Sequence, residues 1–196
     1  MRSYIRSSTL AAFLLLTGAC SKSAPPEAQE AAPATTQAAT AALPSPVLQN
    51  ASALGIPNAH EPLPGLLTAG QIDQAQFDGL AQAGFTTFVS LRLPDEEGAG
   101  WEEAYAKERG LSFTRLPIAG ADGLTRDNVE ALDHILRATG ASHTVVYCGS
   151  ANRVGALLAL RAAWLGGSTA PDALALGRAA GLTRLEADVA RLLETP

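Results

Sequence analysis

Residues 143–165 read HTVVY CGSANR VGALLALRAAWL, and the three parts of this stretch differ in character. The first part, 143–147, is β-branched and aromatic, which is typical of a buried central strand. The last part, from Val154 to Leu165, is apolar and is followed by two glycines, which predicts a buried helix. The six residues between them predict a tight loop that joins the end of the strand to the start of the helix.

That loop has the residue types of an anion-binding site. A strand–loop–helix connection of this kind directs backbone N–H groups and the positive end of the helix dipole at one point. Cys148 opens the loop and Arg153 closes it, so a thiolate nucleophile and a guanidinium that can hold two oxygens of an oxyanion flank the same point. The alternative is that Cys148 is a small buried core residue and Arg153 faces solvent. The residues expected to line the anion site are Gly149, Ser150, Ala151 and Asn152.

This loop resembles the signature loop of the protein tyrosine and dual-specificity phosphatases, which runs from a nucleophilic cysteine after a β-strand to an arginine. Residues 66–71 and 85–97 also resemble the bacterial phosphatase-like domain that occurs fused to beta-lactamase-like hydrolases, and the resemblance covers about residues 50–196. It implies an α/β fold of three layers, with a central, largely parallel sheet flanked by helices. It also implies hydrolysis of phosphate monoesters through a thiophosphate intermediate on Cys148, with no cofactor or metal. The implied substrate is a phosphorylated small molecule or a phosphoprotein.

The resemblance further implies a general acid that protonates the leaving oxygen, on a loop between the strand that ends near Ile118 and the next helix. Asp122 lies there in a run of alanine and glycine, and it is the candidate acid. The alternative is that Asp122 is a turn residue, with Thr125 as the cap of the next helix. Asp95, which follows Pro94 on the loop after the second strand, is the rival acid; the alternative is that it is a surface turn residue.

The remainder of the domain predicts the same alternation of strands and helices. Each helix is bounded by glycine, proline or a capping residue. We expect a strand at 111–118 and helices at 101–109, 126–138, 172–180 and 184–193.

Four features depart from the phosphatase pattern. The spacer between the cysteine and the arginine has four residues, where most of these enzymes have five. Tyr147 and Val154 stand where histidine and a hydroxyl residue are usual, and Ala151 stands where glycine is common and is strained if φ is positive. Two other functions therefore stay open: a rhodanese-like sulfurtransferase, whose active-site loop also begins at a cysteine, and a non-catalytic module that binds phosphate or another anion.

The N-terminus predicts export and a lipid anchor. Arg2 and Arg6 precede a short apolar stretch that ends in small residues before Cys20, and the stretch is too short to span a bilayer. Residues 16–20 resemble the lipobox of bacterial lipoproteins, which implies lipidation of Cys20 and attachment to the periplasmic side of a bacterial membrane. A secretory signal cleaved nearby is the alternative.

The sequence therefore divides into three parts. Residues 1–20 form the signal peptide that ends at the lipobox cysteine, and residues 50–196 form the phosphatase-like domain. Residues 21–49 are rich in alanine and proline and poor in large apolar residues, which predicts a disordered tether because such a segment buries too little surface to offset the entropy of ordering.

Composition limits the possible functions. The net charge is -5 and no run of lysine or arginine occurs, which argues against a nucleic-acid partner. The three histidines have no partner at metal-ligand spacing. Once Cys20 carries a lipid, Cys148 is the only thiol, so no internal disulfide is expected.

Overall fold

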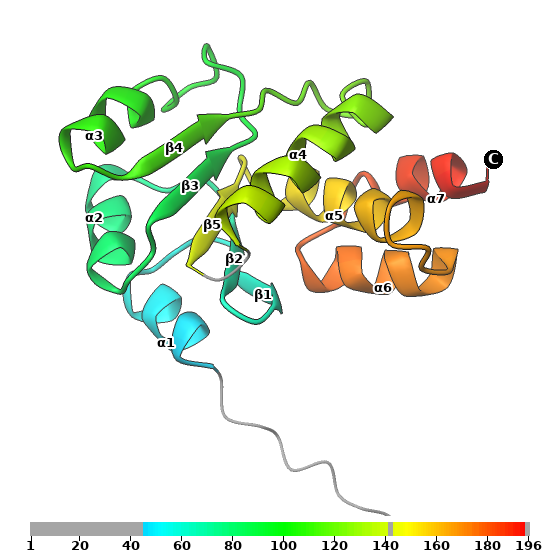
Figure 1. The fold of residues 1–196 in the computed structure, drawn as a ribbon, viewed down its shortest axis with the longest axis horizontal. Helices are drawn as coiled ribbons and strands as arrows, with labels where there is room; N and C mark the ends of the chain where they lie inside the picture. The colour runs from blue at the N-terminus through cyan, green and yellow to red at the C-terminus, as the bar shows by residue number, and fades with distance from the viewer. Residues whose placement is uncertain (1–44, 141–142, 195–196) are drawn as a thin grey trace, which may run out of the picture. The chain divides into compact units, whose positions relative to one another are not determined.

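A five-stranded sheet forms the middle of the computed structural model, which describes residues 45–140 and 143–194. The strand order is β1-β2-β5-β3-β4; β1 runs antiparallel to β2, and the other neighbouring pairs are parallel. The predicted α/β fold with a central, largely parallel sheet is therefore confirmed (Figure 1). The strands are β1 (His60–Leu63), β2 (Leu66–Ala69), β3 (Thr87–Ser90), β4 (Ser112–Arg115) and β5 (Thr144–Tyr147).

The central strand β5 is buried on both faces, as its β-branched and aromatic residues predict. Val145 and Tyr147 contribute to the core on one face of the sheet, and Val146 and Cys148 contribute to the core on the other. This alternation follows from the two-residue period of a strand. Cys148 therefore leaves β5 toward a different layer from its neighbour Tyr147.

Helices cover both faces of the sheet and complete the three layers (Figure 1). One face carries α1 (Pro46–Ala53), α2 (Gln74–Gln82) and α3 (Glu102–Glu108). The helices on the other side are α4 (Arg126–Thr139), α5 (Asn152–Trp164), α6 (Ala170–Ala179) and α7 (Glu186–Glu194), of which α6 and α7 pack against α5.

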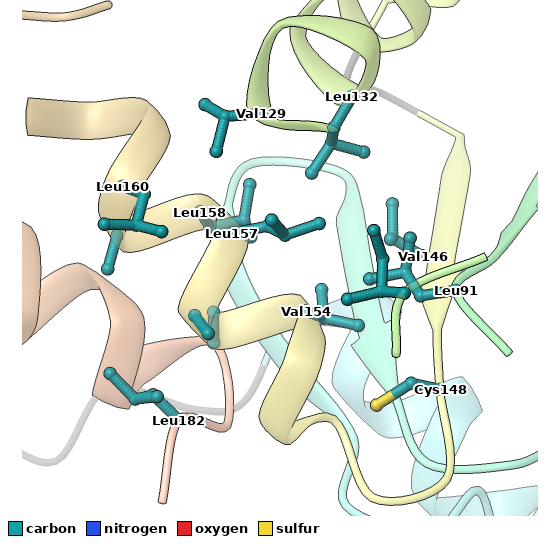
Figure 2. Close-up of a cluster of buried hydrophobic side chains, with 14 of the residues drawn as sticks. Leu91, Val129, Leu132, Val146, Cys148, Val154, Leu157, Leu158, Leu160 and Leu182 are labelled. Atoms are coloured by element: carbon teal, nitrogen blue, oxygen red, sulfur yellow. The ribbon is translucent and has the colours of Figure 1, made fainter. Parts of the chain in front are cut away.

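The two cores differ in composition. Between α2 and the sheet, Phe77 stacks on Phe88 with ring centroids 3.8 Å apart. The core on the α5 side is aliphatic: Figure 2 shows Val129 and Leu132 of α4 gathered with Leu157 of α5 over the sheet. Both cores are continuous with β5, so the strand that ends at Cys148 is held from both faces.

Local sequence explains where the helices begin. The side chain of Thr125 accepts a hydrogen bond from the Asn128 backbone N–H, so Thr125 caps α4 as predicted. Asp73 and Gln76 form a reciprocal capping box at α2. Ser45 caps α1, which then starts at Pro46, a residue suited to the first helical position.

Several observed elements differ from the predicted ones. Residues 46–49 belong to α1, so helical structure begins inside the segment 21–49 that was expected to be a tether. Helix α5 starts at Asn152, two residues before the apolar run. The edge strand β1 was not predicted, because it contains Pro62 and has no alternation of apolar and polar residues.

The signal peptide, Cys20 and most of the tether lie outside the described residues. Within the described ranges, none of the helices has the length and apolar character needed to cross a membrane.

Candidate active site

A pocket of about 710 Å³ lies at the carboxyl end of β5. Open parallel sheets place ligands at this edge, and the volume is in the range of small-molecule sites. The loop from Cys148 to Arg153, here called the anion loop, forms one side of the pocket. Residues of the loops after β3 and β4, and of the segment before α7, form the remainder. The predicted loop therefore borders a site large enough for a small organic ligand.

Cys148 lies at the base of this pocket. The residue is only 1% exposed, yet it contributes to the pocket lining. Its backbone N–H donates to Ala69 O at 3.2 Å, and Cys148 is close enough to Arg153 to contribute to the raised pKa of that guanidinium. Cys148 is therefore part of the core and also borders the pocket. It fits both interpretations of the sequence, a buried core residue and a residue of an anion site.

Ala151 adopts the left-handed conformation that the loop requires, with φ 63° and ψ -11°. For a residue with a side chain, this conformation costs about 1–2 kcal/mol. The Ala151 methyl group is fully buried, and a Cβ atom on Gly181 would lie 2.5 Å from it. Gly181 must therefore stay without a side chain to leave room for Ala151. The strain that was expected at Ala151 is present, and strain of this kind often occurs in functional loops.

The start of α5 has no side-chain cap, as is also true of α3. Side chains cap the N-termini of α1, α2, α4 and α6, whereas the cap position of α5 is Ala151 and makes no side-chain hydrogen bond. The first N–H groups of α5 therefore lack a side-chain acceptor at the edge of the pocket. An uncapped helix start beside a cationic side chain is suited to hold an oxyanion.

Arg153 is held in one orientation by several acceptors. Its Nη1 donates to Glu96 Oε1 at 2.5 Å and its Nη2 to Glu96 Oε2 at 2.8 Å, which is a bidentate pair. Nη1 also donates to the carbonyl oxygens of Ile118 at 2.9 Å and Leu91 at 3.3 Å. These contacts raise the pKa of Arg153, chiefly through the hydrogen bond with Glu96. The guanidinium is therefore charged and fixed beside Cys148.

Glu96 is a site residue that the sequence did not single out. The hydrogen bond from Arg153 lowers the pKa of Glu96 to about 2, with further help from the Leu93 N–H and from Arg92. Arg92 is buried, and its Nη1 has no hydrogen-bond partner within the described ranges. One signal could have indicated Glu96: an acidic run follows the carboxyl end of a predicted strand, at the edge where parallel sheets place their sites.

Asp122 and Asp95, the two candidate acids, are both exposed, and neither lines the pocket. Ala119 and Gly120 do line it, so the loop that carries Asp122 borders the pocket while the carboxylate lies outside. The structure therefore brings together Cys148 and Arg153, and it does not place Asp122 with them.

The four residues between cysteine and arginine have different positions. Gly149, Ser150 and Asn152 line the pocket, whereas Ala151 does not. The backbone of this loop is tied to the residue after β2 through a bridge between Ser150 and Gly70. Three of the four residues in the predicted binding set therefore line the pocket.

Tyr147 cannot help Cys148, because its side chain lies on the other face of the sheet. Its hydroxyl donates to Glu102 Oε1 at 3.4 Å, and burial raises the pKa of Tyr147. Val154 is fully buried and offers no hydroxyl to the loop. No group of three or more His, Cys, Asp or Glu side chains gathers as a metal site in the part of the chain that the structure describes.

Comparison with known proteins places the fold among phosphatases. No family model and no curated protein matches the sequence. Three similar solved structures are a DUF442 protein from Shewanella putrefaciens CN-32 that is named as a phosphatase, TpbA from P. aeruginosa, and SIW14 from S. cerevisiae.

The first of these is 18% identical, covers 75% of this chain and 96% of its own, and has a TM-score of 0.59. TpbA, solved as a cysteine-to-serine variant with phosphotyrosine, is 18% identical over 72% of this chain and 85% of its own, with a TM-score of 0.56. The catalytic core of SIW14, a PP-IP phosphatase solved with citrate, is 15% identical over 71% and 85%, with a TM-score of 0.51. At these identities the likeness establishes a phosphatase-like fold.

Proposed function

We propose that this domain hydrolyses phosphate monoesters with Cys148 as the nucleophile. One observation carries the proposal: the Arg153 guanidinium, fixed by Glu96, lines the same pocket as Cys148, beside the uncapped start of α5. A thiolate, an adjacent cation and free helix N–H groups are the parts that attack on phosphorus and binding of its oxygens require. The phosphotyrosine bound to the TpbA variant supports a phosphorylated substrate for this fold.

The reaction has two steps. The Cys148 thiolate attacks phosphorus, an S–P bond forms, and the P–O bond to the leaving group breaks while that oxygen takes a proton from an acid. Water then gives a proton to the same group and attacks phosphorus, and the S–P bond breaks to release phosphate and the thiolate. Arg153 and the first N–H groups of α5 hold the phosphoryl oxygens in both steps.

The acid in this proposal is Asp122. Glu96 is the carboxylate that lines the pocket, but its pKa of about 2 keeps it ionised near neutral pH, so it has no proton to give. The loop that bears Asp122 is anchored by the buried residues Ile118 and Leu124, and the residues between them are mostly exposed. Movement of this loop over the pocket would bring Asp122 to the leaving oxygen.

The experiment measures phosphate release from 4-nitrophenyl phosphate by the purified protein and its variants. Cys148→Ser is expected to lose turnover by a factor on the order of 10⁴ or more while it still binds inorganic phosphate, because Arg153 and the α5 N–H groups remain. Asp122→Asn is expected to lower turnover by a factor on the order of 10² to 10⁴. The matched control is Asp95→Asn, which removes the same charge from an exposed site outside the pocket.

Other outcomes assign other functions. Thiocyanate formation from thiosulfate and cyanide, with no phosphate release, would identify the sulfurtransferase. Binding of phosphate without either activity would identify a non-catalytic module, which the buried Val154 and the distant Tyr147 hydroxyl favour. Loss of turnover in Asp95→Asn and not in Asp122→Asn would transfer the acid role to Asp95.

We also propose that the protein is exported and anchored by a lipid on Cys20, because the sequence around that cysteine resembles a lipobox. Cys20→Ala is expected to move the protein from the membrane fraction to the soluble periplasmic fraction in a bacterial host. Equal recovery of both forms in the membrane fraction would contradict the anchor.

A further inference from the structure

Arg184, in the segment between α6 and α7, is the feature of the pocket that the proposed chemistry does not use. It lines the same pocket as Cys148 and Arg153, and it is exposed. Every other arginine in the described ranges pairs with a carboxylate. Arg184 has no hydrogen-bond or ion-pair partner among the described residues. It is therefore a cation at the pocket that the fold leaves unneutralised.

The anion loop itself holds the segment that carries Arg184. Asn152 Oδ1 accepts hydrogen bonds from the Thr183 N–H at 2.8 Å, from Thr183 Oγ1 at 3.1 Å and from the Leu185 N–H at 3.3 Å. Asn152 is 6% exposed, so the acceptor of these three bonds is buried. The residues before and after Arg184 are thus tied to the loop between Cys148 and Arg153, which keeps Arg184 at the edge of the pocket.

The other residues of the pocket indicate what kind of ligand would meet both arginines. The pocket carboxylate, Glu96, is already paired with Arg153 and Arg92 and cannot neutralise Arg184 as well. The pocket is far larger than a phosphate group, and Leu93, Ile118 and Leu185 give it an apolar lining. A ligand with an apolar body, one anionic group at Arg153 and a second one near Arg184 would therefore match these residues.

We propose that Arg184 is a second anion-binding residue, and that the substrates are small phosphate monoesters with a second acidic group, a carboxylate or phosphate, beyond an apolar body. This inference rests on the proposed phosphatase function for its account of catalysis. The binding of a ligand with two anionic groups can be tested apart from that function.

The kinetic test compares kcat/KM for 3- and 4-carboxyphenyl phosphate with kcat/KM for their methyl esters. For each variant, kcat/KM for the acid is divided by kcat/KM for its methyl ester, which gives the acid-to-ester ratio. This ratio is then compared between variants, so the difference between the leaving groups cancels. Arg184→Gln is expected to lower the acid-to-ester ratio by up to about fivefold for at least one isomer, the upper limit for an ion pair at an exposed site. Arg184→Lys is expected to retain most of the preference, because it keeps the charge.

The control variant is Arg137→Gln, which removes one positive charge from the last turn of α4, outside the pocket. It is expected to leave the ratio as it is in the unchanged protein. An acid-to-ester ratio in Arg184→Gln equal to that of the unchanged protein for both isomers would overturn the inference. An equal fall in Arg137→Gln would also overturn it, because the effect would then come from net charge.

A binding test separates this inference from the proposed function. The full chain is titrated with 3- and 4-(phosphonomethyl)benzoate and with their methyl esters, none of which can be hydrolysed at the phosphonate. Tighter binding of an acid than of its ester, lost in Arg184→Gln and kept in Arg137→Gln, supports the second anion site even if no aryl phosphate is turned over. Equal binding of acid and ester by the unchanged protein overturns it even if phosphatase activity is present.

Discussion

Two arginine–glutamate pairs near the carboxyl end of the sheet use the same chemistry in different surroundings. Arg153 and Glu96 approach to 2.5 Å beside the pocket, and their side chains are 15% and 25% exposed. Arg115 and Glu102 approach to 2.7 Å between β4 and α3, and their side chains are 14% and 1% exposed. The first pair can still meet a ligand, whereas the glutamate of the second is closed off from solvent.

The pair of Arg115 and Glu102 is here called the closed pair, and the pair of Arg153 and Glu96 the open pair. The closed pair supports the loop on which the open pair depends. Glu102 Oε2 accepts from Arg115 Nη2 and from the Gly100 N–H, both at 2.7 Å. Arg115 Nη1 donates to Arg92 O at 3.3 Å. The closed pair thus holds both ends of the loop that presents Glu96 to Arg153. The comparison indicates that one pair stabilises the site and that the other forms part of it.

The largest effect on stability is expected from Glu102→Ala. This change leaves Arg115 without its carboxylate and removes the acceptor of the Gly100 N–H, and breaking a buried pair in this way costs about 3–5 kcal/mol. The free energy of unfolding is measured by urea denaturation. Turnover per folded molecule is expected to fall less than in variants of the open pair, because Glu102 does not line the pocket.

Glu103→Ala is the matched control, since Glu103 lies next to Glu102 in the first turn of α3 and is exposed. It is expected to change the free energy of unfolding by less than about 0.5 kcal/mol. If Glu102→Ala does not fold, Glu102→Gln is measured in its place. A loss below 1 kcal/mol in either Glu102 variant would mean that the closed pair does not hold the loop.

A smaller loss of stability, about 2 kcal/mol, is expected from Glu96→Gln near neutral pH, because charged hydrogen bonds to Arg153 are replaced by weaker ones. Turnover is expected to fall as well, by up to about 100-fold, since Arg153 loses the partner that orients it. Glu97→Gln, at an exposed neighbouring position, is the control for both measurements. Unchanged turnover in Glu96→Gln would remove Glu96 from the site.

The smallest expected effect is the pH dependence of the difference in stability between the unchanged protein and Glu96→Gln. Arg153 lowers the pKa of Glu96 from its ordinary value of 4.5 to about 2. A carboxyl whose pKa is lowered on folding stabilises the folded state above its ordinary pKa, and this contribution is lost as the pH falls through the lowered value. The difference in free energy of unfolding between the protein and Glu96→Gln should therefore shrink between pH 4.5 and pH 2. A difference that stays constant over this range would contradict the ion pair.

Local sequence patterns predicted the elements around the candidate site. The run before Cys148 and the apolar run after Arg153 predicted β5 and α5, because burial and periodicity are properties of neighbouring residues. The polar start of α5 was placed two residues late, because Asn152 and Arg153 carry no apolar signal. The edge strand β1 was missed because it contains Pro62 and has no alternation of apolar and polar residues.

The partners of the site residues could not be predicted in this way. Glu96 reaches Arg153 across 57 positions, and Asn152 reaches Thr183 across 31. No local pattern distinguishes Glu96 from its acidic neighbours Asp95 and Glu97, which are exposed and lie outside the pocket. Asp122 was chosen from its place in a resembling loop, and the structure leaves its carboxylate outside the pocket.

The sequence by itself determined the layered α/β fold and the strand–loop–helix unit with Cys148 and Arg153 at the ends of its loop, because these depend on alternation, helical periodicity and turn residues along the chain. Only the tertiary structure decided that Arg153 is fixed by Glu96, that Ala151 is strained against Gly181, and that Arg184 lines the same pocket without a partner among the residues that the structure describes. The reason is physical: charge pairing and steric exclusion act over a few ångströms between residues far apart in the chain, and the packing of the layers brings them together.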